Sequence, residues 1–141
     1  MAYQSYKDLE IYKKAHKLAI EIHEMSLHLP RFEMYEGGSQ IRKSSKSVKD
    51  TIVEGFGRRR YKHEFIKYLT YSLSSCDETV SHLHTLYDTK SLEDEEKYQY
   101  FYKEYDCLGK MINNFMKSVN SGHKTRIENP ESSIQNLVSR I

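Results

Sequence analysis

Residues 66–87 read IKYLTYSLSSCDETVSHLHTLY, and the spacing of apolar residues in this stretch decides the fold. The apolar residues recur at alternating steps of three and four, which places them along one face of an α-helix. This stripe consists of Ile66, Leu69, Leu73, Cys76, Val80, Leu83 and Tyr87. No stretch of the chain alternates with the period of two that is typical of a β-strand. The pattern therefore predicts a long helix with one buried face.

Three further stretches show the same helical spacing. The first ends at Pro30, which cannot continue a helix. The second follows Gly37-Gly38, with Ser39 as the expected N-cap, and it stops near Gly55 or Gly57. In chain order the three stripes are Ile11, Ala15, Leu18, Ile22, Met25 and Leu29; Ile41, Ser45, Val48, Ile52 and Phe56; and Tyr98, Phe101, Tyr105, Leu108, Ile112, Phe115 and Val119.

The connections between these stretches are short. Before the last of them, Ser91 and Asp94 match a capping box, in which the Ser91 hydroxyl accepts from the backbone N–H of Asp94. Short connections make consecutive helices antiparallel, and sustained steps of three and four are typical of bundle packing. We predict an all-α fold, an up-down-up-down antiparallel four-helix bundle over residues 1–119.

The end of the chain, residues 120–141, has a different composition. A polar run, NSGHKTRIENPESS, is followed by IQNLVSRI, in which Ile134, Leu137, Val138 and Ile141 would share one face of a short helix. This segment is either a flexible tail or a small amphipathic helix that docks on its own bundle or on a neighbouring subunit.

Length and charge limit the class of protein. A chain of 141 residues fits one domain, and it has no apolar run near the roughly 20 residues that a membrane span needs. The N-terminal residues lack the apolar core of a secretion signal, so we expect a cytoplasmic protein with no membrane partner. Two cysteines, Cys76 and Cys107, are expected to be reduced thiols. The net charge of +2 is small, so binding to a polyanion must depend on local charge.

The patterns typical of enzymes and metal sites are missing from the sequence. No Glu is followed by His three residues later, and His82 and His84 point about 200° apart on a helix. Cys76 lies in a core stripe, where a thiol behaves as a small apolar group. Gly55 and Gly57 lack the Lys and Ser or Thr of a phosphate-binding loop, and we interpret them as hinge glycines. We therefore expect no enzymatic activity, no metal and no cofactor.

Positive charge is concentrated in residues 39–60, which read SQIRKSSKSVKDTIVEGFGRRR. Residues 38–68 contain nine Lys or Arg and three carboxylates, which gives a local charge of +6. Within the second predicted helix, Arg42, Lys46 and Lys49 fall within about 60° of one another. The predicted nucleic-acid-binding residues are Arg42, Lys43, Lys46, Lys49, Arg58, Arg59, Arg60 and Lys62.

Three interpretations of this basic stretch remain open. A phosphate backbone suits it, because each Lys or Arg that meets a phosphate releases counterions. Alternatively the stretch is a solvated helix face on which Asp50 and Glu54 neutralise their neighbours, with Glu54 and Arg58 as an i,i+4 pair. Arginine also suits subunit interfaces, so residues 58–60 would equally pair with acidic residues of a neighbour. Charge alone does not separate RNA, DNA and acidic protein partners.

Several motifs resemble a known family over roughly residues 6–119. These motifs are Tyr6-Lys7-Asp8-Leu9-Glu10-Ile11-Tyr12, Leu29-Pro30, Ser39-Gln40-Ile41-Arg42-Lys43, Glu54-Gly55-Phe56-Gly57-Arg58-Arg59, Glu64-Phe65-Ile66-Lys67-Tyr68-Leu69, Ser72-Leu73 and Glu78. With them the chain resembles the bacterial four-helix-bundle proteins encoded within intervening sequences of 23S ribosomal RNA genes.

The chain departs from the family pattern in two places. Where members usually have an Ile-Pro-Ala-Asn-Ile run, it has residues 48–52, with Lys49 in place of the proline, so we expect a straighter helix. The Ser or Thr usual before the third helix is replaced by residues 60–62, so that helix should start without a side-chain cap.

The resemblance implies an assembly and a class of partner. It implies an antiparallel bundle that forms a ring-like homo-oligomer, a pentamer, with no established enzymatic activity. Bundles of similar fold serve as accessory proteins of diversity-generating retroelements, where a basic pentamer is thought to bind nucleic acid and a reverse transcriptase. We therefore expect a nucleic-acid partner, RNA rather than DNA, and keep as the alternative an interaction scaffold for a polymerase-type protein.

Overall fold

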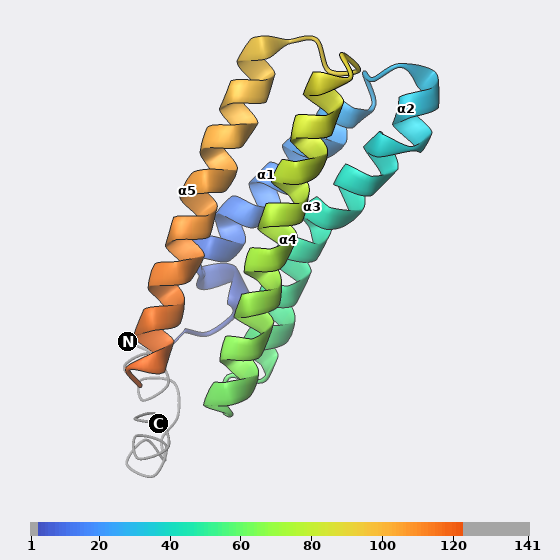
Figure 1. Cartoon of the computed structure of the whole chain (residues 1–141). Helices are drawn as coiled ribbons and strands as arrows, with labels where there is room; N and C mark the ends of the chain where they lie inside the picture. The colour runs from blue at the N-terminus through green and yellow to red at the C-terminus, as the bar shows by residue number, and fades with distance from the viewer. Residues whose placement is uncertain (1–2, 123–141) are drawn as a thin grey trace.

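The chain folds into a bundle of helices. The structure, a computed structural model, describes residues 3–122, and no strand occurs among them. Four long helices lie side by side, α3 packing against both α1 and α4, and α4 against α5 (Figure 1). The elements are the 3-10 helix η1 (Tyr6–Asp8), α1 (Glu10–Ser26), α2 (Arg31–Tyr35), α3 (Gly37–Gly57), α4 (Lys62–Asp88) and α5 (Glu95–Asn120). The prediction of an all-α bundle is confirmed, while most of the predicted tail, residues 123–141, lies outside the described residues.

Three of the four predicted stripes form the core. Every residue of the α1 and α3 stripes is buried, and so is every residue of the α5 stripe except the half-buried Phe115. The short helix α2, between α1 and α3, was not predicted, because its five residues are too few to show a helical period.

The buried face of α4 is rotated from the predicted stripe by roughly 60° at 100° per residue. Phe65 and Leu86 are fully buried although neither belongs to the stripe. Four stripe members are only partly buried: Ile66, Leu73, Val80 and Tyr87. The centre of the buried face is occupied instead by small hydroxyl side chains, namely Ser72, Ser75 and Thr79.

These hydroxyls form hydrogen bonds between α4 and α3. The Ser72 hydroxyl donates to the Val48 carbonyl oxygen at 2.8 Å. The hydroxyl oxygens of Thr79 and Ser44 lie 2.9 Å apart, as do those of Ser47 and Ser75. Small side chains let two helix backbones approach closely, and each buried hydroxyl finds a partner, which avoids the cost of burying an unpaired polar group.

Gly55 continues this close approach toward the end of α3. A Cβ atom at Gly55 would lie 3.1 Å from Cβ of Tyr68 and 3.3 Å from Cδ1 of Phe65, whereas one at Gly57 would meet nothing within 4 Å. The interpretation of both glycines as hinges is therefore wrong for Gly55, which lies inside an unbroken helix and makes room for α4. α3 runs through Lys49 as one continuous 21-residue element.

Glu33 accepts hydrogen bonds from the start of α3 and from Ser91. One of its carboxylate oxygens, Oε1, accepts from the backbone N–H of Gly37 at 2.9 Å, and the other, Oε2, accepts from the Ser91 hydroxyl at 2.6 Å. The predicted cap at Ser39 is wrong because α3 already begins at Gly37. The capping box at Ser91 is wrong too, because Asp94 is itself the N-cap of α5 and accepts from the N–H of Lys97. The expected lack of a side-chain cap on α4 is confirmed.

The two cysteines lie in different environments. Cys76 is buried in the core, and burial, followed by the charge of Asp77, raises the pKa of its thiol to about 12. Cys107 is exposed on α5. Within residues 3–122, no helix is both long enough and apolar enough to cross a membrane.

Candidate nucleic-acid interface

Arg42 is directed toward α1 and α2. Its Nη1 donates to the Ser26 hydroxyl at 2.8 Å, and its Nη2 donates to the Met34 carbonyl oxygen at 3.0 Å. Ser26 is fully buried and donates in turn to the His23 carbonyl oxygen. Arg42 therefore joins three helices, and we remove it from the predicted nucleic-acid surface.

We expect Arg42→Ala to lower the free energy of unfolding by about 2 kcal/mol, because two charged hydrogen bonds disappear. Arg42→Lys should lower the free energy of unfolding by nearly as much, because a single ammonium group cannot reach both acceptors as the guanidinium group does. Denaturant unfolding followed by circular dichroism measures both. Lys43→Ala is the matched control, one position along the same helix and exposed. Wild-type stability in Arg42→Lys would mean that the charge alone matters.

At the corner between α3 and α4, two more of the predicted nucleic-acid-binding residues are buried or bonded within the protein. Lys62 exposes only 2% of its surface, and burial lowers the pKa of its amino group. The guanidinium carbon of Arg59 lies 3.9 Å from the centre of the Phe56 ring, and its Nη1 donates to the Phe56 carbonyl oxygen at 2.9 Å. Lys62 is therefore excluded from the predicted nucleic-acid surface. Arg59 mainly packs against the C-terminal end of α3.

The predicted lysines of α3 lie apart from this corner. Lys43 and Lys46 are exposed and, among the described residues, form no ion pair. Lys49 is half-buried and pairs with Asp50 at 2.8 Å. Because a helix rises 1.5 Å per residue, Lys46 lies about 18 Å along the axis from Arg58. The eight predicted residues therefore do not form one patch.

The exposed charges at the α3–α4 corner do form a patch. Arg58 pairs with Glu64 at 3.2 Å, and Lys67 contacts the other oxygen of the same carboxylate at 3.4 Å. The predicted pair between Glu54 and Arg58 is thus replaced by a partner on α4. We define the corner patch as Arg58, Arg60, His63 and Lys67, all exposed. Lys67 was missed, although its position on the same helix face as Glu64 could have indicated it.

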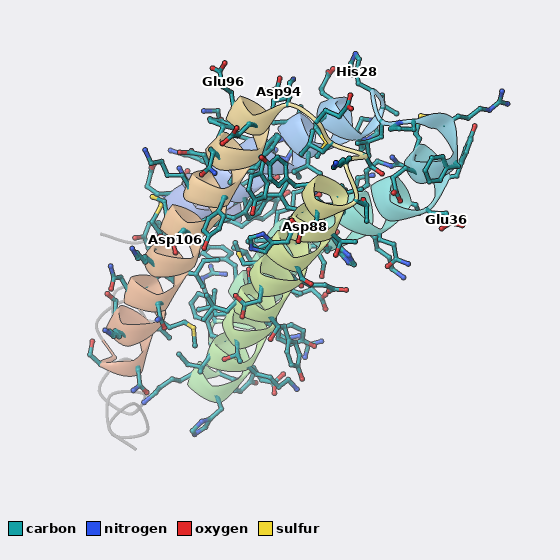
Figure 2. The ribbon with its side chains drawn as sticks, turned by 45° about the horizontal axis from the view of Figure 1, so that its top comes forward. His28, Glu36, Asp88, Asp94, Glu96 and Asp106 are labelled. Carbon is teal, nitrogen blue, oxygen red and sulfur yellow. The ribbon has the colours of Figure 1, made fainter. Side chains whose placement is uncertain are left out.

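The two ends of the bundle carry opposite charge. The corner patch lies at the end where α3 meets α4, and the connection between α4 and α5 lies at the other end (Figure 1). There the carboxylates outnumber the lysines, and Figure 2 shows Asp88, Asp94 and Glu96 around that connection. The exposed acidic residues around this connection are Asp88, Glu93, Asp94, Glu95 and Glu96, against Lys90 and Lys97. A polyanion would therefore be attracted to the corner end and repelled from the other.

The residues described show no arrangement typical of a metal centre, since nowhere in 3–122 do three or more His, Cys, Asp or Glu side chains gather closely enough to hold an ion. His82 pairs with Glu78 at 3.7 Å on α4. His84 instead makes a 2.5 Å hydrogen bond through Nδ1 with the hydroxyl of Tyr98. The two histidines thus have separate neighbours, as their spacing predicted.

Comparison with known proteins gives the family. The model of the 23S rRNA-intervening sequence proteins matches residues 7–114, from η1 through most of α5. The chain belongs to this family. The matched span of the 23S rRNA-intervening sequence protein includes the whole corner patch and the α3–α4 contact at Gly55. No curated protein matches the chain.

Proposed function

We propose that this 23S rRNA-intervening sequence protein is a non-enzymatic helical bundle that binds nucleic acid, structured RNA in preference to DNA. The observation that carries the proposal is the corner patch, where exposed cations gather at the end of the bundle opposite its acidic end. Lys43 and Lys46 extend the positive surface along α3.

The physical basis is electrostatic attraction to phosphate. Each cation that meets a phosphate releases counterions, so affinity should be high at low salt and fall steeply as salt rises. Such contacts position a nucleic acid without reading its sequence. Glu64 takes up part of the charge of Arg58 and Lys67, so Arg60, Lys43 and Lys46 carry the least compensated charge of this positive surface.

The assembly belongs to the same proposal. We infer an up-down-up-down order of the four long helices, supported by the short connections at residues 58–61 and 89–94. We also infer a ring-like homo-oligomer, a pentamer, in the cytoplasm. A ring repeats the corner patch around its axis, so that several weak phosphate contacts act together. Cys76 is not expected to act as a nucleophile, because burial raises the pKa of its thiol above neutral pH.

The test is light scattering coupled to size exclusion, with the ratio of absorbance at 260 and 280 nm, on protein purified at low salt and again after about 1 M salt. We expect a mass about five times that of one chain, with nucleic acid that high salt removes. A monomer would contradict the assembly. An oligomer that is free of nucleic acid at both salts, and that binds no added RNA at low salt, would contradict the binding.

The second candidate is a protein-interaction scaffold for a partner such as a polymerase. Phe32 and Tyr35 on α2 favour it, because they expose 67% and 66% of their surfaces to solvent. Exposed aromatic side chains of this kind are typical of protein interfaces. The scaffold predicts a clean oligomer whose partner binding depends on α2 rather than on the corner patch.

A further inference from the structure

An aromatic face accompanies the corner patch. Tyr61, the N-cap residue of α4, exposes 60% of its surface, and Tyr71 exposes 47%. Lys67 and Tyr68 lie three and four residues after Glu64, and Tyr71 lies four and three residues after them, so the four residues share one face of α4. Tyr71 therefore lies on the same face of α4 as Lys67, and Tyr61 directly follows Arg60 at the start of the same helix.

Tyr68 joins the charged and aromatic parts of this surface. The guanidinium carbon of Arg58 lies 4.9 Å from the centre of the Tyr68 ring, and Nζ of Lys67 lies 5.4 Å from it. The rings of Tyr68 and Tyr71 meet edge to face, with centres 5.5 Å apart and planes at 84°. In an edge-to-face pair, the edge of one ring contacts one face of the other. Tyr68 therefore covers at most one face of the Tyr71 ring. The contacts fix Tyr68 and leave Tyr71 available for stacking.

Exposed aromatic faces beside cations suit one form of nucleic acid better than the other. The bases of a continuous duplex are stacked on one another, so a protein meets mainly its phosphates and sugars. An unpaired base offers a flat face, and stacking on an aromatic side chain adds to the phosphate contacts without requiring a particular sequence. Cations alone would give no such preference.

We propose that the corner patch, together with Tyr61 and Tyr71, binds unpaired nucleotides, such as those of an RNA loop, in preference to continuous duplex. This inference rests on the proposed function and names the substrate class of the same site. Arg58, Arg60 and Lys67 contact phosphates, and the two tyrosine rings stack on bases.

The test compares the full chain with its double variant Tyr61→Leu/Tyr71→Leu on two probes, a short oligouridine and a blunt RNA duplex of equal length. At the same salt concentration, the wild type should bind the oligouridine more tightly. The double variant should lose about tenfold or more of that affinity, because two stacking platforms are removed, and should keep its duplex affinity. Tyr61→Phe/Tyr71→Phe should bind like the wild type, since the rings remain.

A matched control removes two other exposed rings. Phe32→Leu/Tyr35→Leu changes a pair on α2, at the opposite end of the bundle from the corner, and should alter neither affinity. Because the chain has no Trp, Tyr71→Trp also supplies a single fluorescent reporter. Its emission should change on adding oligouridine and stay constant with duplex. This fluorescence measurement tests the stacking even if the leucine variant folds poorly.

The outcomes separate this inference from the proposed function. Unchanged oligouridine affinity in the leucine variant, or an equal loss on both probes, would overturn the stacking. If Arg58→Glu/Arg60→Glu abolishes binding while the leucine variant retains it, only this inference fails. If the wild type binds neither probe at low salt, the proposed function itself fails.

Discussion

Arg58→Glu/Arg60→Glu is expected to reduce RNA affinity by about a hundredfold or more at low salt, because two phosphate contacts become repulsive. The variant should still fold, since Arg58 and Arg60 are exposed. Arg59 is left in place because it packs on Phe56 and bonds to its carbonyl oxygen. Filter binding or fluorescence anisotropy with a structured RNA measures the loss, and circular dichroism with light scattering checks folding and assembly.

The control must separate local charge from net charge. Lys17→Glu/Lys103→Glu reverses two exposed lysines on α1 and α5, so both variants change the net charge from +2 to −2. This control should lose far less affinity than the corner variant, and its salt dependence should stay close to that of the wild type. Equal losses in the two variants would show that overall charge, not the corner patch, governs binding.

Gly55→Leu is expected to lower the free energy of unfolding by about 3 kcal/mol. Even the first added carbon would lie 3.1 Å from Cβ of Tyr68, which the α4 backbone holds in place, so α3 and α4 must move apart. That movement would also stretch the hydrogen bond between the Ser72 hydroxyl and the Val48 carbonyl oxygen. Denaturant unfolding monitored by circular dichroism gives the stability.

Gly57→Leu is the matched control for the same substitution two residues away. A Cβ there meets nothing within 4 Å, so stability should change by less than about 1 kcal/mol. If both variants were equally destabilised, the approach of Gly55 to Tyr68 would not be the cause. A stable Gly55→Leu variant would show that α4 can move away at little cost.

Much of the fold could be predicted because helical periodicity reports burial directly. The α1 stripe from Ile11 to Leu29 is buried at every position. On α4 the prediction counted only apolar residues, so it missed the face centred on Ser72 and Thr79, whose hydroxyls are buried because α3 supplies their partners. A local pattern could not find the role of Glu33 either, since Ser91 lies 58 positions away.

The candidate site could be predicted only in part, because sequence gives charge but not where a long side chain is directed. Arg42 shares a helix face with the lysines of α3, yet Ser26 and Met34 accept its hydrogen bonds. Lys62 follows three arginines and is buried. Conversely, Lys67 joins the patch only because Glu64 holds both it and Arg58. These differences depend on contacts between helices.

The hydroxyl contacts between α3 and α4 also bear on how the protein would meet a ligand. Segments held by many buried contacts open least often, and here buried hydroxyl hydrogen bonds join α3 and α4, the two helices that carry the corner patch. The surface would therefore already have its bound shape before a ligand arrives, so association would cost little conformational entropy on the protein side. The conformational entropy lost on binding would then come mainly from the nucleic acid, whose flexible loops would adapt to the fixed surface of the protein.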